Sequence, residues 1–218
     1  LDKRTASVAE EEAGEVPLTL RRVWDFAMTA PLDELRFILE TSRLNKAAAE
    51  RSFAGEFGHC VGRTLCCDRE RKVMGDSIFT RILSYTSAAC DARMAGAMIP
   101  VMSNSGSGNQ GITASVPVVE YARQKAADRE RLLRALIVAD LTTIHQKTGI
   151  GRLSAYCGAV SAGCGAAAGI AYLNGGGYSE IAHTVVNALA VCSGAHSITA
   201  SFPSRRASAV RRSVISSA

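Results

Sequence analysis

The stretch Val101-Met-Ser-Asn-Ser-Gly-Ser-Gly-Asn-Gln-Gly-Ile112 organises the interpretation of the whole chain. Residues 103–111 carry no charge and no large apolar side chain, and glycine with small polar residues can expose backbone N–H groups to a ligand. If Asn109 and Gln110 open a helix, its dipole favours a small anion such as a carboxylate. A flexible connector is the alternative interpretation. The predicted binding residues are Ser103, Asn104, Ser105, Gly106, Ser107, Gly108, Asn109 and Gln110.

On both sides of this loop, apolar residues recur at helical spacing, and period-2 alternation is nearly absent. Thr19, Asp76 and Asp128 are suitable N-caps for the helices that follow them. Residues 55–75 are expected to form a glycine-rich turn and an exposed stretch. Pro117 is expected to kink its helix or to mark a late start. The predicted helices cover approximately residues 20–30, 31–39, 44–53, 77–94, 112–125, 129–147, 153–173, 179–189 and 204–216.

These elements predict an all-α fold, a multi-helix bundle of about eight to ten helices with buried Ala/Gly-rich central helices. A hydrophobic content of 47% is enough for a sizeable core, whereas aromatic residues make up only 6%. We expect residues 1–15 to be a disordered N-terminal segment and residues 16–218 to form a single helical domain.

Charge and hydropathy exclude two classes of partner. The net charge of +5 is modest, and basic patches interleaved with aromatic residues are lacking, so nucleic acid is not expected as a partner. The run from Leu153 to Leu173 carries no charge and is long enough to span a membrane. Because it consists mainly of Ala, Gly, Ser and Cys, we interpret it as a helix buried in a protein core.

The chain has seven cysteines, an odd number, and no CxxC pair. This usage predicts free or metal-bound thiols in the reducing cytoplasm and gives no support to a zinc ribbon. Cys157 and Cys164 are seven residues apart, which would place both on one face of a helix. Thiolates gathered in this way suit an iron–sulfur cluster or zinc, although buried cysteines are more often inert. Lys147 precedes this run and can pair with a carboxylate or act as a base.

Taken together, several strings closely resemble the L-cysteine desulfidase family, which is related to the alpha chain of iron–sulfur L-serine dehydratases. The resemblance covers nearly the whole chain, and the loop and the Cys157 string are its most specific parts. The strings are Ser103-Asn-Ser-Gly-Ser-Gly-Asn-Gln-Gly-Ile112, Asp91-Ala-Arg-Met-Ala-Gly96, Gly151-Arg-Leu-Ser-Ala-Tyr-Cys-Gly-Ala159, Gly165-Ala-Ala-Ala-Gly-Ile170, Val191-Cys-Ser-Gly-Ala195 and, more loosely, Val23-Trp-Asp-Phe-Ala27 and Leu44-Asn-Lys46.

The resemblance implies a helical serine-dehydratase-alpha-like domain and an oxygen-sensitive [4Fe–4S] cluster with one iron free to act as a Lewis acid. The implied reaction is β-elimination from a small L-amino acid: L-cysteine to pyruvate, ammonia and sulfide, or L-serine to pyruvate and ammonia. Cys157 and Cys192 match two ligand positions, and the loop matches the substrate-binding loop. Lys147 is our candidate for charge pairing with the substrate.

Two departures from the family pattern bear on activity. The family usually continues Cys-Asp-Gly-Ala-Lys to a further cysteine, whereas here Ser193 follows Cys192 and Thr199 stands at the later position. The family's N-terminal half carries a Gly-Cys-Thr-Glu-Pro motif that this chain lacks, so a second chain or a missing half is an expected partner. We therefore expect either a cytoplasmic lyase, as a homo-oligomer, or a non-catalytic helical relative that binds a small carboxylate or serves in assembly.

Overall fold

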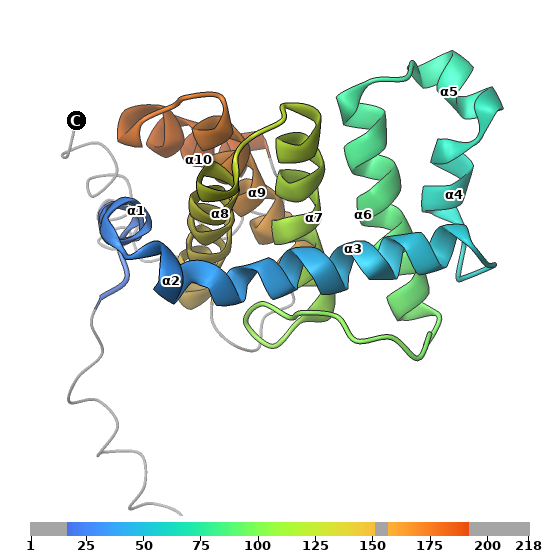
Figure 1. Ribbon diagram of the computed structural model, residues 1–218, viewed down its shortest axis with the longest axis horizontal. Helices are drawn as coiled ribbons and strands as arrows, with labels where there is room; N and C mark the ends of the chain where they lie inside the picture. Colours follow the sequence, from blue (N-terminus) through green and yellow to red (C-terminus); the bar gives the residue numbers. More distant parts are fainter. Residues whose placement is uncertain (1–16, 151–156, 192–218) are drawn as a thin grey trace, which may run out of the picture.

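The computed structural model describes residues 17–150 and 157–191 (Figure 1). Within these residues the regular structure is helical, apart from one isolated antiparallel bridge between Asn104 and Ser107, so the all-α prediction is confirmed. The helices are α1 (Leu20–Thr29), α2 (Leu32–Leu35), the 3-10 helix η1 (Arg36–Ile38), α3 (Leu39–Phe53), α4 (Val61–Cys66), α5 (Asp68–Met74), α6 (Ile78–Met94), α7 (Gly108–Gln124), α8 (Arg129–Ile150), α9 (Gly158–Leu173) and α10 (Tyr178–Val191).

The first helices follow the local signals of the sequence. Thr19 caps α1 by accepting a hydrogen bond of 3.2 Å from the N–H of Arg22, as predicted. Pro31 then separates α1 from α2. From Leu32 onward α2, η1 and α3 follow one another without a loop, so the two helices expected over residues 31–53 form one nearly continuous segment. In Figure 1 this segment runs across α8, α7 and α6.

Residues 55–75 differ from the expectation, because they contain the short helices α4 and α5 rather than only a turn and an exposed stretch. Helix α4 packs against α6 through Gly62, where an added Cβ would lie 2.5 Å from the Cβ of Ala88. This tertiary contact holds a helix too short for its periodicity to be recognised. Helix α6 is capped by Ser77, which accepts from the N–H of Thr80, and not by the predicted Asp76.

Helix α7 begins at Gly108 and continues through Pro117, so the expected late start is wrong. Its side chains are buried along most of its length, and they contribute to both hydrophobic clusters of the described residues. One cluster joins α7 to α1, α8, α9 and α10, and the other joins it to α3 and α6. The N-terminal part of α7 therefore packs in the second cluster and its C-terminal part in the first.

Small residues allow the central helices to approach closely, as predicted. An added Cβ at Gly165 of α9 would lie 2.1 Å from Thr143 Oγ1 and 2.4 Å from the carbonyl oxygen of Ala139, both on α8. At Gly169 an added Cβ would lie 2.8 Å from the carbonyl oxygen of Ala135. Because only hydrogen fits at these positions, the glycines set the distance between α8 and α9.

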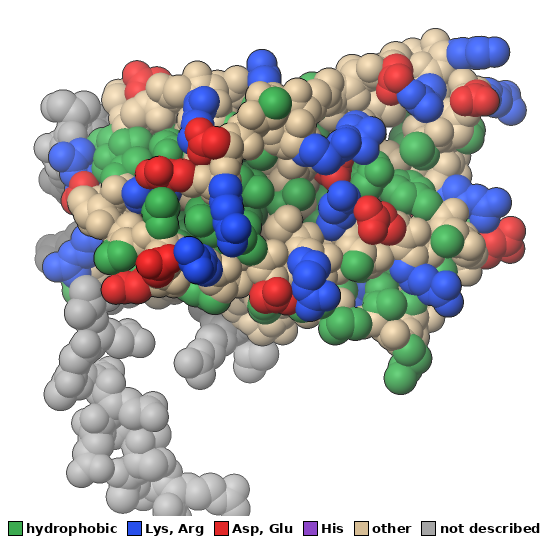
Figure 2. All heavy atoms as spheres, in the orientation of Figure 1, with side chains coloured by type: hydrophobic (Ala, Val, Ile, Leu, Met, Phe, Trp, Pro, Cys, Tyr) green, Lys and Arg blue, Asp and Glu red, His purple; other side chains and the backbone are tan. Residues whose placement is uncertain are grey.

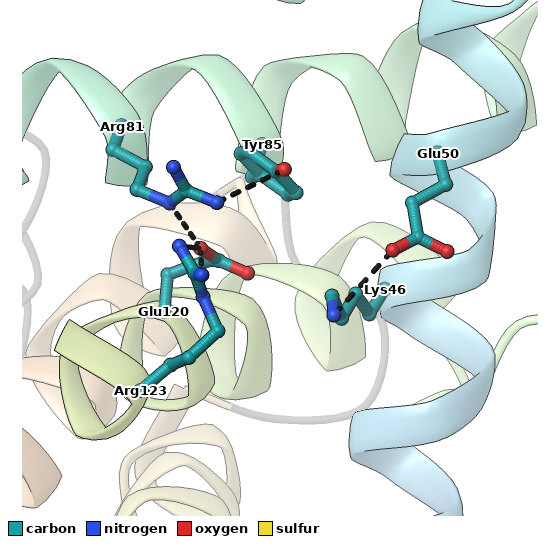
Figure 3. A network of polar contacts seen from close by, with 6 residues as sticks. All are labelled: Lys46, Glu50, Arg81, Tyr85, Glu120 and Arg123. Carbon is teal, nitrogen blue, oxygen red and sulfur yellow. Dashed lines mark hydrogen bonds and ion pairs between the residues drawn. The ribbon is translucent and has the colours of Figure 1, made fainter. Parts of the chain in front are cut away.

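A polar network joins α6 to α7 on the other side of the bundle (Figure 3). The side chain of Glu120 is fully buried and accepts from Arg81 Nε at 2.7 Å and from Arg123 Nε at 3.3 Å. Arg81 also donates to the hydroxyl of Tyr85 at 3.1 Å. A buried carboxylate needs such partners to compensate for its lost hydration.

The face of the molecule in Figure 2 carries charges of both signs. Lys and Arg side chains alternate with Asp and Glu over the face in Figure 2. Among the helices of the described residues, none is both long and apolar enough to cross a bilayer.

Candidate functional site

The loop between α6 and α7 ends in a tight turn that leads directly into a helix. Asn104 and Ser107 exchange two backbone hydrogen bonds of 3.1 and 3.0 Å, and the central residues Ser105 and Gly106 have φ of 49° and 80°. Ser107 then caps α7 by accepting from the N–H of Gln110 at 3.3 Å. A helix therefore begins at this loop, with Gly108 as its first residue, and the first N–H groups of a helix lack partners within it. That this N-terminus binds an anion stays a prediction.

Asn45 of α3 holds the loop in place from the core side. Its Oδ1 accepts from the N–H of Met102 at 2.8 Å, and its Nδ2 donates to the carbonyl oxygen of Met102 at 3.3 Å and to Ser115 Oγ at 2.9 Å. At Gly111 an added Cβ would lie 2.1 Å from the carbonyl oxygen of Met102. The loop is therefore a fixed part of the fold, which argues against the flexible connector.

Beneath the turn lies a buried polar chain from α7 through the loop to α8. Asn104 Oδ1 accepts from Gln110 Nε2 at 3.0 Å, and Asn104 Nδ2 donates to Asp140 Oδ1 at 2.9 Å. Burial raises the pKa of Asp140 to about 6, because desolvation outweighs the hydrogen bond from Asn104, which lowers it. Neither Gln110 Oε1 nor Asp140 Oδ2 has a hydrogen-bond partner within the part of the chain that the structure describes.

On the outer side of the turn, Arg93 of α6 reaches the start of α7. Its Nη1 donates to Asn109 Oδ1 at 3.0 Å, and an added Cβ at Gly108 would lie 2.2 Å from Arg93 Nε. Among the described residues no carboxylate forms an ion pair with this guanidinium. A guanidinium and a helix N-terminus at one place form a site suited to a carboxylate.

The N-terminus of α9 reaches the same region. An added Cβ at Gly158 would lie 2.3 Å from Gln110 Oε1, so the absence of a side chain there leaves room for the amide. Cys157 is the N-cap of α9 and is exposed. Burial raises the pKa of Cys90 on α6 to about 11, although the charge of Arg93 opposes this increase.

The two cysteines predicted to share a helix face do not do so. Cys157 precedes the first residue of α9 and is exposed, whereas Cys164 lies within the helix and is buried. The prediction assumed a helix that starts at residue 153 and includes both cysteines. Because α9 begins only at Gly158, helical periodicity does not relate Cys157 to Cys164. Cys164 therefore faces the core and not the loop.

The described residues alone do not form a complete cluster site. No group of three or more His, Cys, Asp or Glu residues that could hold a metal ion occurs among them. Cys157 is the single predicted ligand that they include, while Cys192 and the departure at Thr199 lie outside them. An iron–sulfur cluster held by three thiolates would thus need thiolates from outside the described residues.

The remaining predicted residue, Lys147, lies in the last turn of α8 and is half-buried. It follows Asp140 by seven residues, so the two share one face of the helix. Its neighbour His145 is turned elsewhere: burial lowers the pKa of His145, and a hydrogen bond involving the backbone of Leu18 opposes that effect.

Three residues of the site were not among the predicted ones: Asn45, Arg93 and Asp140. Asp140 had a detectable signal, since it is the one acid within the apolar run Leu132-Leu-Arg-Ala-Leu-Ile-Val-Ala-Asp-Leu141. Asn45 and Arg93 lie in strings that resemble the family, but their own surroundings gave no further indication. Their roles depend on helices that are distant in the sequence.

Comparison with known proteins assigns the family. A family model described as serine dehydratase alpha chain matches residues 4–195, most of the chain. The chain belongs to the serine dehydratase alpha chain family. The predicted family relationship is therefore confirmed.

The relatives of this serine dehydratase alpha-type chain include UPF0597 proteins, whose name states no activity. One from Bacteroides fragilis is 58% identical over 200 residues, which cover 89% of this chain and 47% of the relative. One from Bacteroides thetaiotaomicron is 56% identical with the same coverage, and one from Desulfitobacterium hafniense is 48% identical over 178 residues, covering 81% of this chain and 40% of the relative. The chain thus spans about half the length of these relatives or less. No solved structure matches it significantly.

Proposed function

We propose that this chain is the amino-acid-binding half of an iron–sulfur-dependent β-elimination lyase that acts on L-cysteine or L-serine. The observation that carries the proposal is Arg93, which has no carboxylate partner among the described residues and lies over the N-terminus of α7. In a member of the serine dehydratase alpha chain family, this is the place where we expect the substrate's carboxylate.

In the proposed reaction the substrate loses its Cα proton and its Cβ substituent, which end up as hydrogen sulfide from L-cysteine or as water from L-serine. The resulting 2-aminoacrylate is hydrolysed to pyruvate and ammonia. Arg93 and the first N–H groups of α7 bind the carboxylate and orient the substrate, and Asn109 holds Arg93 in place by the hydrogen bond of 3.0 Å. Lys147 provides further charge pairing from the same face of α8 as Asp140.

When bound, a [4Fe–4S] cluster supplies a Lewis-acidic iron that withdraws electrons from the leaving group. Cys157 and Cys192 are the residues of this chain that would hold it. The exposure of Cys157 at the N-terminus of α9 supports this assignment, because an exposed thiol is accessible to a cluster. The remaining thiolates would come from the part of the protein that corresponds to the other half of the relatives.

The test is anaerobic reconstitution with iron and sulfide, together with the other half of the protein where that is a separate chain. A broad absorbance band near ~400 nm is expected, as thiolate-bound clusters give, and pyruvate should be released from L-cysteine or L-serine. Cys157→Ala should abolish both signals. The matched control is Cys67→Ala, because Cys67 is also exposed but lies between α4 and α5. A cluster band and pyruvate release that both survive Cys157→Ala would refute the ligand assignment.

The alternative is a non-catalytic relative that binds a small carboxylate or serves as an assembly subunit. It is favoured by Thr199 at the place of the family's third cysteine. In that case the reconstituted protein would bind L-serine without a cluster band and without release of pyruvate. The loop and Arg93 serve the ligand in both proposals, so binding measurements alone do not distinguish them, whereas the absorbance band does.

A further inference from the structure

Two buried oxygen atoms beneath the loop lack a hydrogen-bond donor among the described residues: Gln110 Oε1 and Asp140 Oδ2. The Gln110 residue is 0% exposed and Asp140 is 8% exposed. Asn104 occupies the other polar atoms of both side chains, since it binds Gln110 Nε2 and Asp140 Oδ1. A buried acceptor without a donor costs about 1–3 kcal/mol, and a charged one more. The arrangement therefore calls for a donor that the described residues do not supply.

The group that would fit must be small, must donate more than one hydrogen bond, and should be positively charged to match the Asp140 carboxylate. Gly158 packs directly against Gln110 Oε1, where an added Cβ would lie 2.3 Å from that atom, so a group that binds there must be small. A primary ammonium group has three donors around a compact charge. A carboxylate has only acceptor atoms, and a thiol is a weak donor, so neither would satisfy the two oxygen atoms of Gln110 and Asp140.

We propose that Gln110 Oε1 and Asp140 Oδ2 bind the α-ammonium group of a small L-amino acid. This inference rests on the proposed function, which places the carboxylate of the same ligand at Arg93 and the N-terminus of α7. The two subsites adjoin adjacent residues of α7, because Asn109 contacts Arg93 and the next residue, Gln110, contacts Asn104. The first turn of α7 thereby contributes to an anion subsite and to a cation subsite.

The assignment explains why this loop contains paired amides. The amide of Asn104 binds Gln110 Nε2 and Asp140 Oδ1 and so holds the two side chains together. Gln110 Oε1 and Asp140 Oδ2 remain without a partner among the described residues. Without Asn104 the two acceptors would not be held together. In this view Asn104 is a positioning residue, and specificity for amino acids over other carboxylates comes from Asp140 and Gln110.

The experiment compares two ligands that differ in the ammonium group, L-serine and 3-hydroxypropanoate, by calorimetric titration of the full protein. In the unmodified protein L-serine should bind more tightly. Asp140→Asn should weaken L-serine binding at least about tenfold, because a charge-assisted hydrogen bond is lost, and should change 3-hydroxypropanoate binding less than about twofold. The matched control is the exposed Asp25→Asn on α1, which should alter neither affinity.

Equal losses for both ligands, unchanged selectivity in Asp140→Asn, or no binding of L-serine by the unmodified protein would each overturn the inference. If Asp140→Asn does not fold, as judged by circular dichroism, Gln110→Met removes the second acceptor at similar volume and is compared in the same way. The proposed function is judged separately by pyruvate release. If pyruvate is released but the preference for L-serine does not depend on Asp140, the lyase proposal stands and this inference is refuted. If the preference depends on Asp140 but no pyruvate is released, this inference stands and the lyase proposal is refuted.

Discussion

Asp140 offers a test of the buried polar chain through the pH dependence of stability. Burial raises the pKa of Asp140 from an ordinary value of 3.8 to about 6. Each pKa unit corresponds to about 1.4 kcal/mol, so the difference of roughly two units corresponds to about 3 kcal/mol of unfolding free energy. Replacement of Asp140 by Asn removes the titrating group while keeping the oxygen that accepts from Asn104.

The sign follows from the protons bound in each state. At pH values between about 4 and 6 the folded protein retains a proton on Asp140 that the unfolded chain has released, so the free energy of unfolding falls as pH rises. The stabilising contribution is complete below about pH 4 and is lost above about pH 7. The Asp140→Asn variant should lack this pH-dependent contribution. Its free energy of unfolding relative to that of the unmodified protein should therefore increase by up to about 3 kcal/mol as the pH rises from about 4 to about 7.

Urea unfolding followed by circular dichroism, at constant ionic strength from about pH 4.5 to pH 7.5, measures this difference. The variant and the unmodified protein share all other titrating groups, which therefore cancel in the comparison. Asp25→Asn provides the control, because the Asp25 side chain is 56% exposed and its curve should run parallel to that of the unmodified protein. A difference between Asp140→Asn and the unmodified protein that stays constant over this pH range would refute the argument.

Three further predictions concern the packing and the loop. Gly165→Ala should lower the free energy of unfolding by about 1–3 kcal/mol, since its Cβ would lie 2.4 Å from a carbonyl oxygen of α8. Gly163→Ala in the same helix meets nothing within 4 Å and should raise it by about 0.5–1 kcal/mol; similar urea midpoints for the two would contradict the close approach of α8 and α9. Asn45→Ala should cost about 1–3 kcal/mol because it leaves the partly buried N–H of Met102 without its acceptor, and an unchanged hydrogen-exchange rate at that N–H would be the contrary result. Asn109→Ala should weaken binding of substrate or product without unfolding the chain; calorimetry and thermal melts test this, and an unchanged affinity would mean that the loop only connects α6 to α7.

Local signals predicted the helices where the side chains themselves decide the structure. Thr19 and Ser107 satisfy N–H groups within three residues of themselves, and Pro31 interrupts a helix through its own ring. The signal failed where packing decides. Gly62 allows α4 to lie against α6, and this contact stabilises a helix of six residues that has no periodicity of its own.

The candidate site was predicted in part. The loop residues 103–110 and the helix that follows them were expected, since glycine, serine and amide side chains mark such a loop. The partners of the loop were not expected, because they come from other helices. Asn45 is 57 residues from Met102, and Asp140 is 36 residues from Asn104.

The sequence by itself determined the all-α class, the family and the position of the polar loop, because helical periodicity, N-caps and short motifs are properties of neighbouring residues. Only the tertiary structure decided that Arg93 and Asp140 contact that loop and the helix after it, and that Cys164 is buried whereas Cys157 is exposed. The physical reason is that these contacts join residues of different helices, and the packing of the helices decides which residues meet. Here the glycines of α9 bring it against α8, and the two parts of α7 pack in different hydrophobic clusters.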